Sequence, residues 1–446
     1  MTRLLRTAVA LLLAAVAIGA ATPAVGTTPA TLPGLTEVGR TSLSPRLLEL
    51  TFRTTALSHD TKVRVLLPAG YATSGRRYPV LYLLNGGGGS WVDWTTQGDA
   101  EKATAGTPAI VVMPDGGQGG NYTDWYGNDG GGTKPRWETY HLTQLLPWVD
   151  RHFRTVPERS QRAVAGLSMG GNGALHYAAR HPDLFIAAAS FSGANDVFHP
   201  IIYPITETTE ISNGALPGSV FGPRATEEVR WHASNPVDLA GNLRATWVSL
   251  AFGNGQPGGP DGNTGVDVIE TAVHDSNLSL HEQLLAAGIP HVFHDYGPGA
   301  HNWFYWQRDL LEALPALMRV FAEHRRPPTR ITYSSIDPAY SVFGWSVRLT
   351  RPALEGSRLV DAGASGFVLE GSGTAVVASP AVYRRGQHLT LTVQDQAGSH
   401  TRSVVVGSDR RLTVAVDLGP GNAFQQYTVP AQLAGTAVHQ ARVTVS

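Results

Sequence analysis

Residues 163–171, Ala-Val-Ala-Gly-Leu-Ser-Met-Gly-Gly, are the stretch on which the interpretation of this sequence depends. A short apolar run leads into the pattern Gly-x-Ser-x-Gly, and an alanine-rich run typical of a helix follows from Gly173 to Arg180. Strand, sharp turn and helix, in this order, are the context in which the pattern forms a nucleophile elbow. The glycines fit because the serine has strained backbone angles and a neighbouring Cβ would collide with the strand or the helix. We therefore predict that Ser168 is a nucleophile and that the N–H of Met169 points toward a developing oxyanion.

A serine nucleophile needs a general base, and the base needs a carboxylate that orients it. In α/β-hydrolases the chain order is Ser, then Asp or Glu, then His. His301 follows the last predicted strand, residues 291–296, in a Gly/Pro loop before a closing helix, so we predict that it is the base. The carboxylate must then lie between Gly253 and His301. Spacing alone leaves four candidates open: Asp261, Asp267, Glu270 and Asp275.

Continuous apolar strands alternate with helices over most of the chain, which indicates a parallel sheet covered on both faces. Two segments before these strands alternate and predict an antiparallel pair, whereas residues 194–244 show only weak periodicity. We predict an α/β-hydrolase domain over residues 43–325. The expected strands are residues 47–52, 62–67, 78–84, 109–113, 163–167, 185–191, 245–252 and 291–296, and the expected helices are residues 138–153, 173–180, 266–287 and 303–321.

The two ends of the chain differ from this central part. Arg3 and Arg6 precede an apolar run over residues 8–21, which predicts a secretory signal peptide at residues 1–24 and a run too short to span a membrane comfortably. Residues 25–42 are expected to be an extended linker. Residues 330–446 carry short alternating strands separated by Gly, Ser and Asp turns, which predicts a β-sandwich accessory domain. Its role is open between a glycan- or wall-binding module and a stabilising module.

Composition excludes several classes of protein. The 446 residues suit two domains and a leader, and the net charge of −1 gives no electrostatic footprint for nucleic acid or anionic membrane. Cysteine is absent from the sequence, which excludes disulfides, thiolate zinc sites and a cysteine nucleophile. With the predicted leader, these observations indicate a secreted, extracellular or cell-wall-associated protein without a stable membrane span.

Several motifs resemble the antigen 85 mycolyltransferases and the wider putative-esterase (esterase D-like) family, in the same order and with nearly the same spacing. The resemblance covers about residues 45–322. The motifs are Tyr82-Leu83-Leu84-Asn85-Gly86, Val112-Met113-Pro114-Asp115-Gly116-Gly117-Gln118, Asp124-Trp125-Tyr126, Gly166-Leu167-Ser168-Met169-Gly170-Gly171, Gly253-Asn254-Gly255, Ser276-Asn277-Leu278 and His301-Asn302-Trp303 with Tyr305-Trp306.

The resemblance implies roles for further residues. It assigns the orienting carboxylate to Glu270, with Asp267 as the alternative, and the second oxyanion N–H to Gly87. It places Trp303 at the wall of the substrate pocket, and Asn85 where the family has an acceptor-binding Asp. That family carries Asp-Gly-Leu-Arg where this chain has residues 85–88, Asn-Gly-Gly-Gly, so the resemblance argues against trehalose as the acceptor.

Tryptophans in the expected loops are further candidates for substrate contact, because indole faces stack on sugar rings and line acyl channels equally well. Trp91 and Trp125 are the residues that we predict to bind substrate in this way, and Trp94 and Trp306 are also candidates.

These observations predict a serine-dependent enzyme that acts on lipid or sugar esters through an acyl-enzyme, with water or an alcohol as the acceptor. A mycolyltransferase-like acyltransferase and a carboxylesterase share every step up to the acceptor. A wall- or matrix-binding protein on a non-catalytic hydrolase scaffold is the alternative from another class. The predicted chemistry needs neither a metal nor an organic cofactor.

Overall fold

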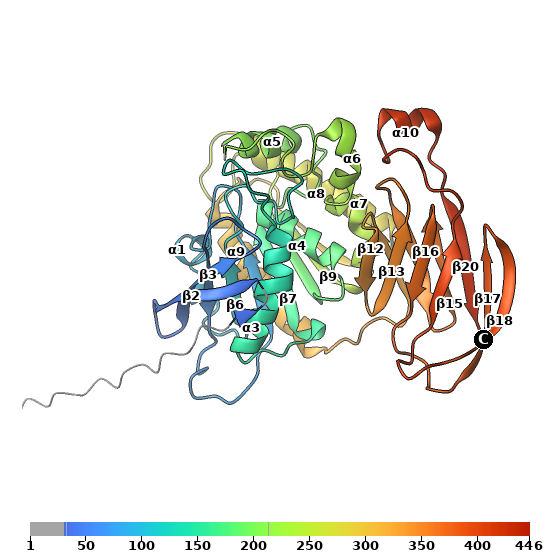
Figure 1. Ribbon diagram of the computed structural model, residues 1–446. Coiled ribbons are helices and arrows are strands. Elements are labelled where there is room, and N and C mark those ends of the chain that lie inside the picture. Colours follow the sequence, from blue (N-terminus) through green and yellow to red (C-terminus); the bar gives the residue numbers. More distant parts are fainter. Residues whose placement is uncertain (1–30, 33, 213) are drawn as a thin grey trace, which may run out of the picture.

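The computed structural model describes residues 31–32, 34–212 and 214–446. An α/β part and an all-β part lie side by side (Figure 1). The predicted signal peptide, residues 1–24, lies outside the described residues. Among the helices that are described, none has both the length and the hydropathy needed to cross a membrane.

Ten strands of the described chain form one mixed sheet in the order β1-β2-β3-β4-β6-β5-β7-β8-β9-β10. The first four strands and the β4–β6 pair are antiparallel, and the strands from β6 to β10 pair in parallel. Strands β5 to β8 are buried along their whole length, because helices cover both faces of this part of the sheet. The strands are β1 (Thr31–Leu32), β2 (Leu35–Ser42), β3 (Leu47–Thr54), β4 (Thr61–Leu66), β5 (Val80–Leu84), β6 (Ile110–Pro114), β7 (Arg162–Leu167), β8 (Ala187–Phe191), β9 (Trp247–Phe252) and β10 (His291–Asp295).

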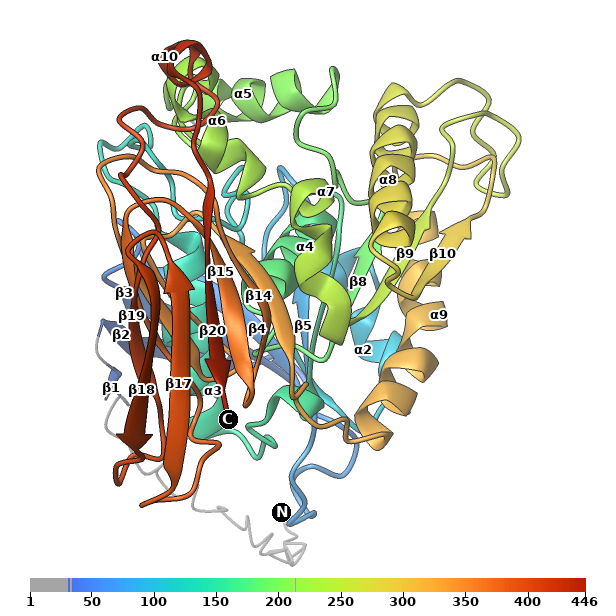
Figure 2. The same ribbon diagram turned by 90° about the vertical axis from the view of Figure 1, so that its right-hand side faces the viewer.

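Two hydrophobic clusters mark the two faces of this sheet. One contains residues of α3, α4 and α8, and the other contains residues of α1, α2 and α9. Figure 2 shows α8 and α9 beside β9 and β10. The helices are α1 (Asp93–Thr96), α2 (Ala100–Ala103), α3 (Leu146–His152), α4 (Met169–Arg180), α5 (Ile202–Ser212), α6 (Arg224–His232), α7 (Pro236–Leu239), α8 (Val268–Ala286) and α9 (Trp303–Ala322), with a π-helix η1 (Thr139–Leu145) and 3-10 turns η2 (Arg159–Gln161) and η3 (Ala240–Ala245).

The structure confirms the predicted α/β-hydrolase fold and differs from the sequence interpretation in three segments. Part of the expected linker, residues 25–42, is strand β2, which pairs with β3 and buries Leu35 completely. The expected helix at residues 138–153 begins as the π-helix η1. The described part of residues 194–244 contains three α-helices and the start of the 3-10 turn η3, and residues such as Trp231 are buried there.

The all-β part has two antiparallel sheets whose buried side chains share one hydrophobic cluster, which is a sandwich arrangement. A short helix near the C-terminus was not expected. The six-stranded sheet is β11 (Ile331–Ser335), β14 (Ser357–Gly363), β15 (Gly366–Gly371), β20 (His439–Val445), β17 (His388–Asp395) and β18 (Gly398–Val405). The four-stranded sheet is β12 (Ala339–Val342), β13 (Trp345–Thr350), β16 (Thr374–Ala378) and β19 (Thr413–Asp417), and the helix is α10 (Val429–Ala434).

Polar contacts join the sandwich to the C-terminal end of α4. The Tyr333 hydroxyl donates to the carbonyl of Arg180 (2.6 Å), and the Arg180 guanidinium pairs with Asp337 (3.0 Å). The same guanidinium pairs with Glu138 (3.2 Å), which also accepts from His181 (2.7 Å). The far end of the helix that begins after Ser168 is therefore fixed against the sandwich.

Candidate active site

Ser168 lies between β7 and α4 with φ 52° and ψ −121°, so its backbone has the left-handed strain expected at a nucleophile elbow. Its N–H donates to the carbonyl of Phe191 on the neighbouring strand (2.9 Å). Gly170 has to be glycine, because a Cβ there would lie 2.5 Å from the carbonyl oxygen of Asn85. The packed turn thus holds the strained serine in place.

A chain of two hydrogen bonds joins Ser168 to a histidine and a glutamate. Ser168 Oγ lies 2.8 Å from His301 Nε2, and His301 Nδ1 lies 2.7 Å from Glu270 Oε2. The His301 side chain is 11% exposed and the Glu270 side chain is 0% exposed. The imidazole therefore spans from a solvent-accessible hydroxyl to a fully buried carboxylate.

The second oxygen of Glu270 is also satisfied. Oε1 accepts from the Ser192 hydroxyl (2.9 Å) and from the N–H of Gly253 (2.7 Å). Ser192 and Gly253 directly follow β8 and β9, so the carboxylate is held at the edge where the parallel strands end. These two donors fix the carboxylate orientation and leave Oε2 for His301.

The other candidate carboxylates do not contact the imidazole. Asp267 is the N-cap of α8, where its Oδ1 accepts from the N–H groups of Ile269 and Glu270 (3.0 Å each). Its Oδ2 accepts from the backbone N–H of His301 (2.8 Å). Asp267 therefore joins the helix that carries Glu270 to the loop that carries His301.

Asp261 has a similar supporting role, because it accepts from the Asn302 amide (2.8 Å) and the Tyr305 hydroxyl (2.9 Å) at the start of α9. Asp275 is more exposed and faces His274. Of the four carboxylates that spacing left open, the structure brings Glu270 to the histidine, as the resemblance implied.

The two predicted oxyanion donors lie beside Ser168. Gly87 and Met169 line the same cavity as Ser168. Met169 is the first residue of α4, so its N–H has no acceptor within the helix. The N–H groups of Gly88 and Gly89 donate to Gln118 and Gly86, whereas that of Gly87 has no acceptor among the described residues.

The cavity beside Ser168, which we call the acyl cavity, has a volume of about 100 Å³ and a largely apolar lining. Its walls come from α4, α5 and α8 and from the segment after β8. The apolar side chains that line it are Met169, Ala194, Val197, Ile202, Ile205, Ile269, Ala272 and Val273.

The structure places the other predicted substrate-binding residues in different surroundings. Asn85 is 1% exposed; its Oδ1 accepts from the Gly116 N–H (2.9 Å) and its Nδ2 donates to Gly86, so it holds the loop together and does not line the acyl cavity. Trp303 packs on Trp94, with ring centroids 5.2 Å apart. It also packs on Trp306, which lies edge-on to His301.

Trp91 and Trp125 both line a second, larger cavity, described further below. Sequence reasoning missed Ser192 and the two contacts of Asp267. Their signal was positional: Ser192 directly follows a predicted buried strand, and Asp267 lies at the start of a predicted helix, where Asp is a favoured cap.

Comparison with known proteins identifies the family of this chain. The sequence profile of the family described as Putative esterase matches residues 54–317. An esterase of Mycobacterium tuberculosis is 40% identical over 276 residues, which are 60% of this chain and 58% of that protein. The diacylglycerol acyltransferase/mycolyltransferase Ag85B of Mycolicibacterium smegmatis is 32% identical over 282 residues, 59% of this chain and 82% of the relative.

Among solved structures, MPT51 (FbpC1) of Mycobacterium tuberculosis superposes with a TM-score of 0.50 at 24% identity, over 60% of this chain and 96% of that chain. This likeness supports the α/β-hydrolase fold. The chain matches little more than half the length of the Mycobacterium tuberculosis esterase. Since the family profile covers more than half of this chain, the protein belongs to the Putative esterase family, and the family resemblance inferred from the motifs is confirmed.

Proposed function

We propose that this protein is a serine esterase or acyltransferase whose catalytic residues are Ser168, His301 and Glu270. The observation that carries the proposal is the hydrogen-bonded chain from the Ser168 hydroxyl through both nitrogens of His301 to the buried carboxylate of Glu270. A strained serine, a histidine and a buried carboxylate in this geometry are the parts of an activated nucleophile.

The reaction follows from the position of each group. Ser168 Oγ attacks the ester carbonyl while His301 Nε2 takes its proton, and the N–H groups of Gly87 and Met169 stabilise the oxyanion. His301 then gives the proton to the departing alcohol, which leaves an acyl group on Ser168. Water or a second alcohol attacks this acyl-enzyme, with His301 again as base, and Ser168 regains its proton.

The acyl cavity favours a short apolar acyl group. Its lining is mostly Ile, Val, Ala and Met, and its volume of about 100 Å³ is well below the roughly 300–1,000 Å³ of pockets that hold drug-sized ligands. A long acyl chain would have to leave the cavity past Ile205 and Ile269, which are 40% and 47% exposed. We expect 4-nitrophenyl acetate and butyrate to have higher kcat/KM values than the palmitate ester.

Trehalose is not the acceptor that this geometry favours. Asn85, at the position of the family's acceptor-binding Asp, is buried and bonded within the protein, and glycine occupies the position of the family's Arg. The related Ag85B is a diacylglycerol acyltransferase/mycolyltransferase and the Mycobacterium tuberculosis relative is an esterase. Both reactions fit the proposed acyl-enzyme, which is why the acceptor has to be measured.

A fluorophosphonate probe tests the proposal directly, because it reacts with an activated serine. We expect the probe to label the wild type and to fail to label Ser168→Ala, while Ser192→Ala keeps the labelled site. Absence of labelling in folded wild type would disprove the proposed function. A 4-nitrophenyl ester with and without added glycerol or sugar then separates the two reactions: faster release and an acylated acceptor indicate transfer, and free acid alone indicates hydrolysis.

We also propose that the protein is exported, with residues 1–24 as its signal peptide and the sandwich of residues 330–446 as an accessory domain. Arg3, Arg6 and the apolar run after them support export. N-terminal sequencing of the protein recovered outside the cells is expected to start near residue 25. A protein retained in the cytoplasm with Arg3 still present would contradict this.

A further inference from the structure

A cavity of about 370 Å³ lies against the loop that provides the Gly87 N–H, and it is larger than the acyl cavity. Gly89 and Ser90 line the larger cavity, whereas Gly87 lines the acyl cavity. The segment after β6 divides in the same way, with residues 117–120 on the larger cavity and Asn121 on the acyl cavity. The N–H of Gly88 donates to the carbonyl of Gln118 (2.7 Å) and joins these two loops. The two cavities therefore share the walls that hold the oxyanion donor.

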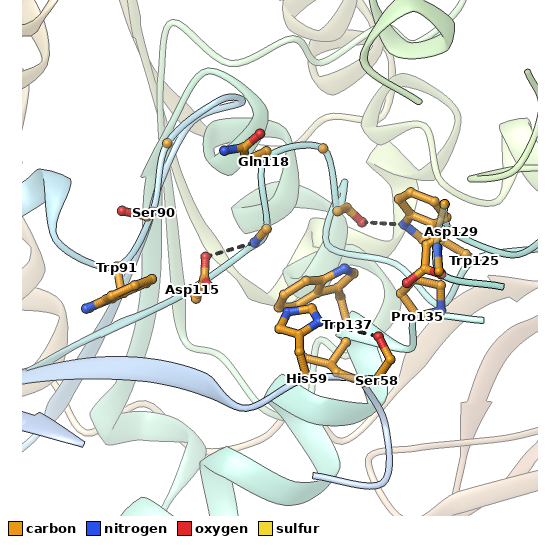
Figure 3. A pocket seen from close by; sticks show the side chains of 17 residues that line it. Ser58, His59, Ser90, Trp91, Asp115, Gln118, Trp125, Asp129, Pro135 and Trp137 are labelled. Atoms are coloured by element: carbon orange, nitrogen blue, oxygen red, sulfur yellow. Dashed lines mark hydrogen bonds between the residues drawn. The ribbon is translucent and has the colours of Figure 1, made fainter. Parts of the chain in front are cut away.

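Three tryptophans line this larger cavity, which we call the tryptophan cavity. Figure 3 shows Trp91 on one side and Trp125 on the other, with Trp137 and His59 between them in this view. The indole N–H of Trp91 donates to Glu49 (3.1 Å) and that of Trp125 donates to the carbonyl of Gly120 (3.1 Å). These bonds hold two of the rings in place before any ligand binds, which lowers the entropy cost of binding.

Polar groups complete the lining. Asp115 accepts from the Gly117 N–H (3.0 Å) through one oxygen, and its other oxygen accepts no hydrogen bond within the described part of the chain. Burial raises the pKa of Asp115 to about 6. Its second oxygen is available for a hydrogen bond with a ligand. Gln118 and Ser90 add an amide and a hydroxyl, and the glycines of the lining expose backbone N–H and C=O groups.

The composition of this lining selects one class of ligand. It contains neither Lys nor Arg, so an anionic group would find no counter-charge apart from a protonated His59. Leu57 and Pro135 are the only residues of the lining with aliphatic side chains, so an acyl chain would meet mostly polar groups and aromatic rings. Indole faces pack on the C–H faces of a sugar ring, while a carboxylate, an amide and backbone groups bond to its hydroxyls.

We propose that the tryptophan cavity binds a neutral carbohydrate, and that this carbohydrate is the alcohol portion of the ester on which the enzyme acts. The second half of this statement rests on the proposed function. The ester would cross the Gly87–Gly89 loop, with its acyl group in the acyl cavity and its sugar in the tryptophan cavity.

Binding is tested in the full-length Ser168→Ala protein, which cannot turn over a substrate. Isothermal titration with xylotetraose, cellotetraose and mannotetraose is expected to show binding of at least one of them. Trp91→Leu in the same protein is expected to weaken this binding at least tenfold. The matched control is Trp247→Leu, because Trp247 is a partly buried tryptophan at the start of β9 and lies outside the cavity. This variant is expected to leave saccharide binding unchanged.

Should Trp91→Leu fail to fold, His59→Ala replaces it, because His59 is exposed. We expect this variant to bind the saccharide at least threefold more weakly. Absence of binding to all three saccharides at millimolar concentration, or equal losses in Trp91→Leu and Trp247→Leu, would overturn the proposal. Binding of tetramethylammonium that Trp91→Leu abolishes would overturn it as well, because carboxylate and aromatic rings would then form a cation site.

The link to catalysis has its own measurement. The ratio of kcat/KM for acetylated xylotetraose to that for 4-nitrophenyl acetate is expected to fall at least tenfold in Trp91→Leu and to stay constant in Trp247→Leu. Fluorophosphonate labelling reports the proposed function separately. Saccharide binding without labelling would refute the esterase and leave the carbohydrate site, whereas labelling without saccharide binding would refute the carbohydrate site and leave the esterase.

Discussion

Two largely buried glutamates in this protein each accept hydrogen bonds from histidine, but in different settings. Glu270 accepts from His301, whose other nitrogen faces the Ser168 hydroxyl. Glu138 accepts from His181 (2.7 Å) and His176 (3.3 Å), near the contact with the sandwich. A carboxylate–histidine pair is therefore not itself a sign of catalysis.

The difference lies in what each pair faces on its other side. Glu270 is held by neutral donors, a hydroxyl and a backbone N–H, and its histidine bonds to Ser168, which lines the acyl cavity. Glu138 is held by the Arg180 guanidinium as well, and the second nitrogen of His176 is buried without a partner among the described residues. The first pair is the one that we propose to move a proton during catalysis, whereas the second forms an ionic link between the α/β part and the sandwich.

Substitution of Ser168, the proposed nucleophile, should have the largest effect on activity. Ser168→Ala is expected to lower kcat for 4-nitrophenyl acetate at least about 10⁴-fold, because the acyl-enzyme can no longer form. Its unfolding midpoint should stay close to that of the wild type, since no buried ion pair is lost. Near-normal turnover in this variant would show that another group is the nucleophile.

Matched substitutions of the two glutamates give the next largest contrast. Glu270→Gln should lower kcat about 10³-fold or more, because the amide cannot stabilise the imidazolium that forms during the reaction. Glu138→Gln should keep kcat at 25 °C but lower the free energy of unfolding by about 3 kcal/mol, because Arg180 loses a buried partner. Kinetics and urea unfolding of both variants check this. A stable but inactive Glu138→Gln, with an active but destabilised Glu270→Gln, would show that the roles of the two glutamates are reversed.

Asp267→Asn tests how the proposed catalytic groups are positioned. Asn caps a helix about as well as Asp, so α8 should remain intact. The amide can no longer accept from the His301 N–H if its oxygen keeps the cap, so the histidine loop loses one of its anchors. We expect kcat of Asp267→Asn to fall about tenfold with little change in KM. Asp267→Glu should also be less active than the wild type, because its longer side chain misplaces the cap. An unchanged kcat would show that the loop needs no such anchor.

The smallest expected effect is the pH dependence of stability. Burial alone would raise the pKa of Glu138, but Arg180 and the two histidines outweigh it and hold this pKa well below its ordinary value. A carboxyl group whose pKa is lower in the folded than in the unfolded protein stabilises the fold. This stabilisation is complete above the pKa of the unfolded state and is lost as the pH falls toward the pKa of the folded state. The unfolding temperature of the wild type should thus fall between about pH 5 and about pH 3, and Glu138→Gln should show a shallower fall. Parallel curves for the two proteins would contradict this role.

The sequence predicted those parts of the site whose position follows from chain order. Ser168 follows the buried strand β7 and His301 follows β10, the last strand of the sheet. Parallel strands end at one edge of the sheet, so the approach of the two residues could be expected. Four carboxylates lay in the right interval, and spacing could not separate them because α8 and the loop before it place them by tertiary contacts. The resemblance to the family resolved this choice in favour of Glu270.

The elements that were missed depend on contacts between distant segments. Strand β2 lies in a segment rich in polar residues, and its pairing with β3 and the burial of Leu35 are not visible in a local pattern. Glu210 at the end of α5 is buried and accepts from the N–H groups of Ser219 and Val220. Hydrophobic periodicity cannot indicate that such a polar residue lies in the core. The buried role of Asn85 has the same origin, because its partner Gly116 follows another strand.

The helix α4 begins directly after Ser168 and ends at Arg180, whose carbonyl and guanidinium both bond to the sandwich. The sandwich of residues 330–446 therefore contacts the α/β part directly, at the end of the helix that begins after Ser168. A chimera that exchanged the sandwich for another domain would leave the C-terminal end of α4 without its contacts to Tyr333 and Asp337.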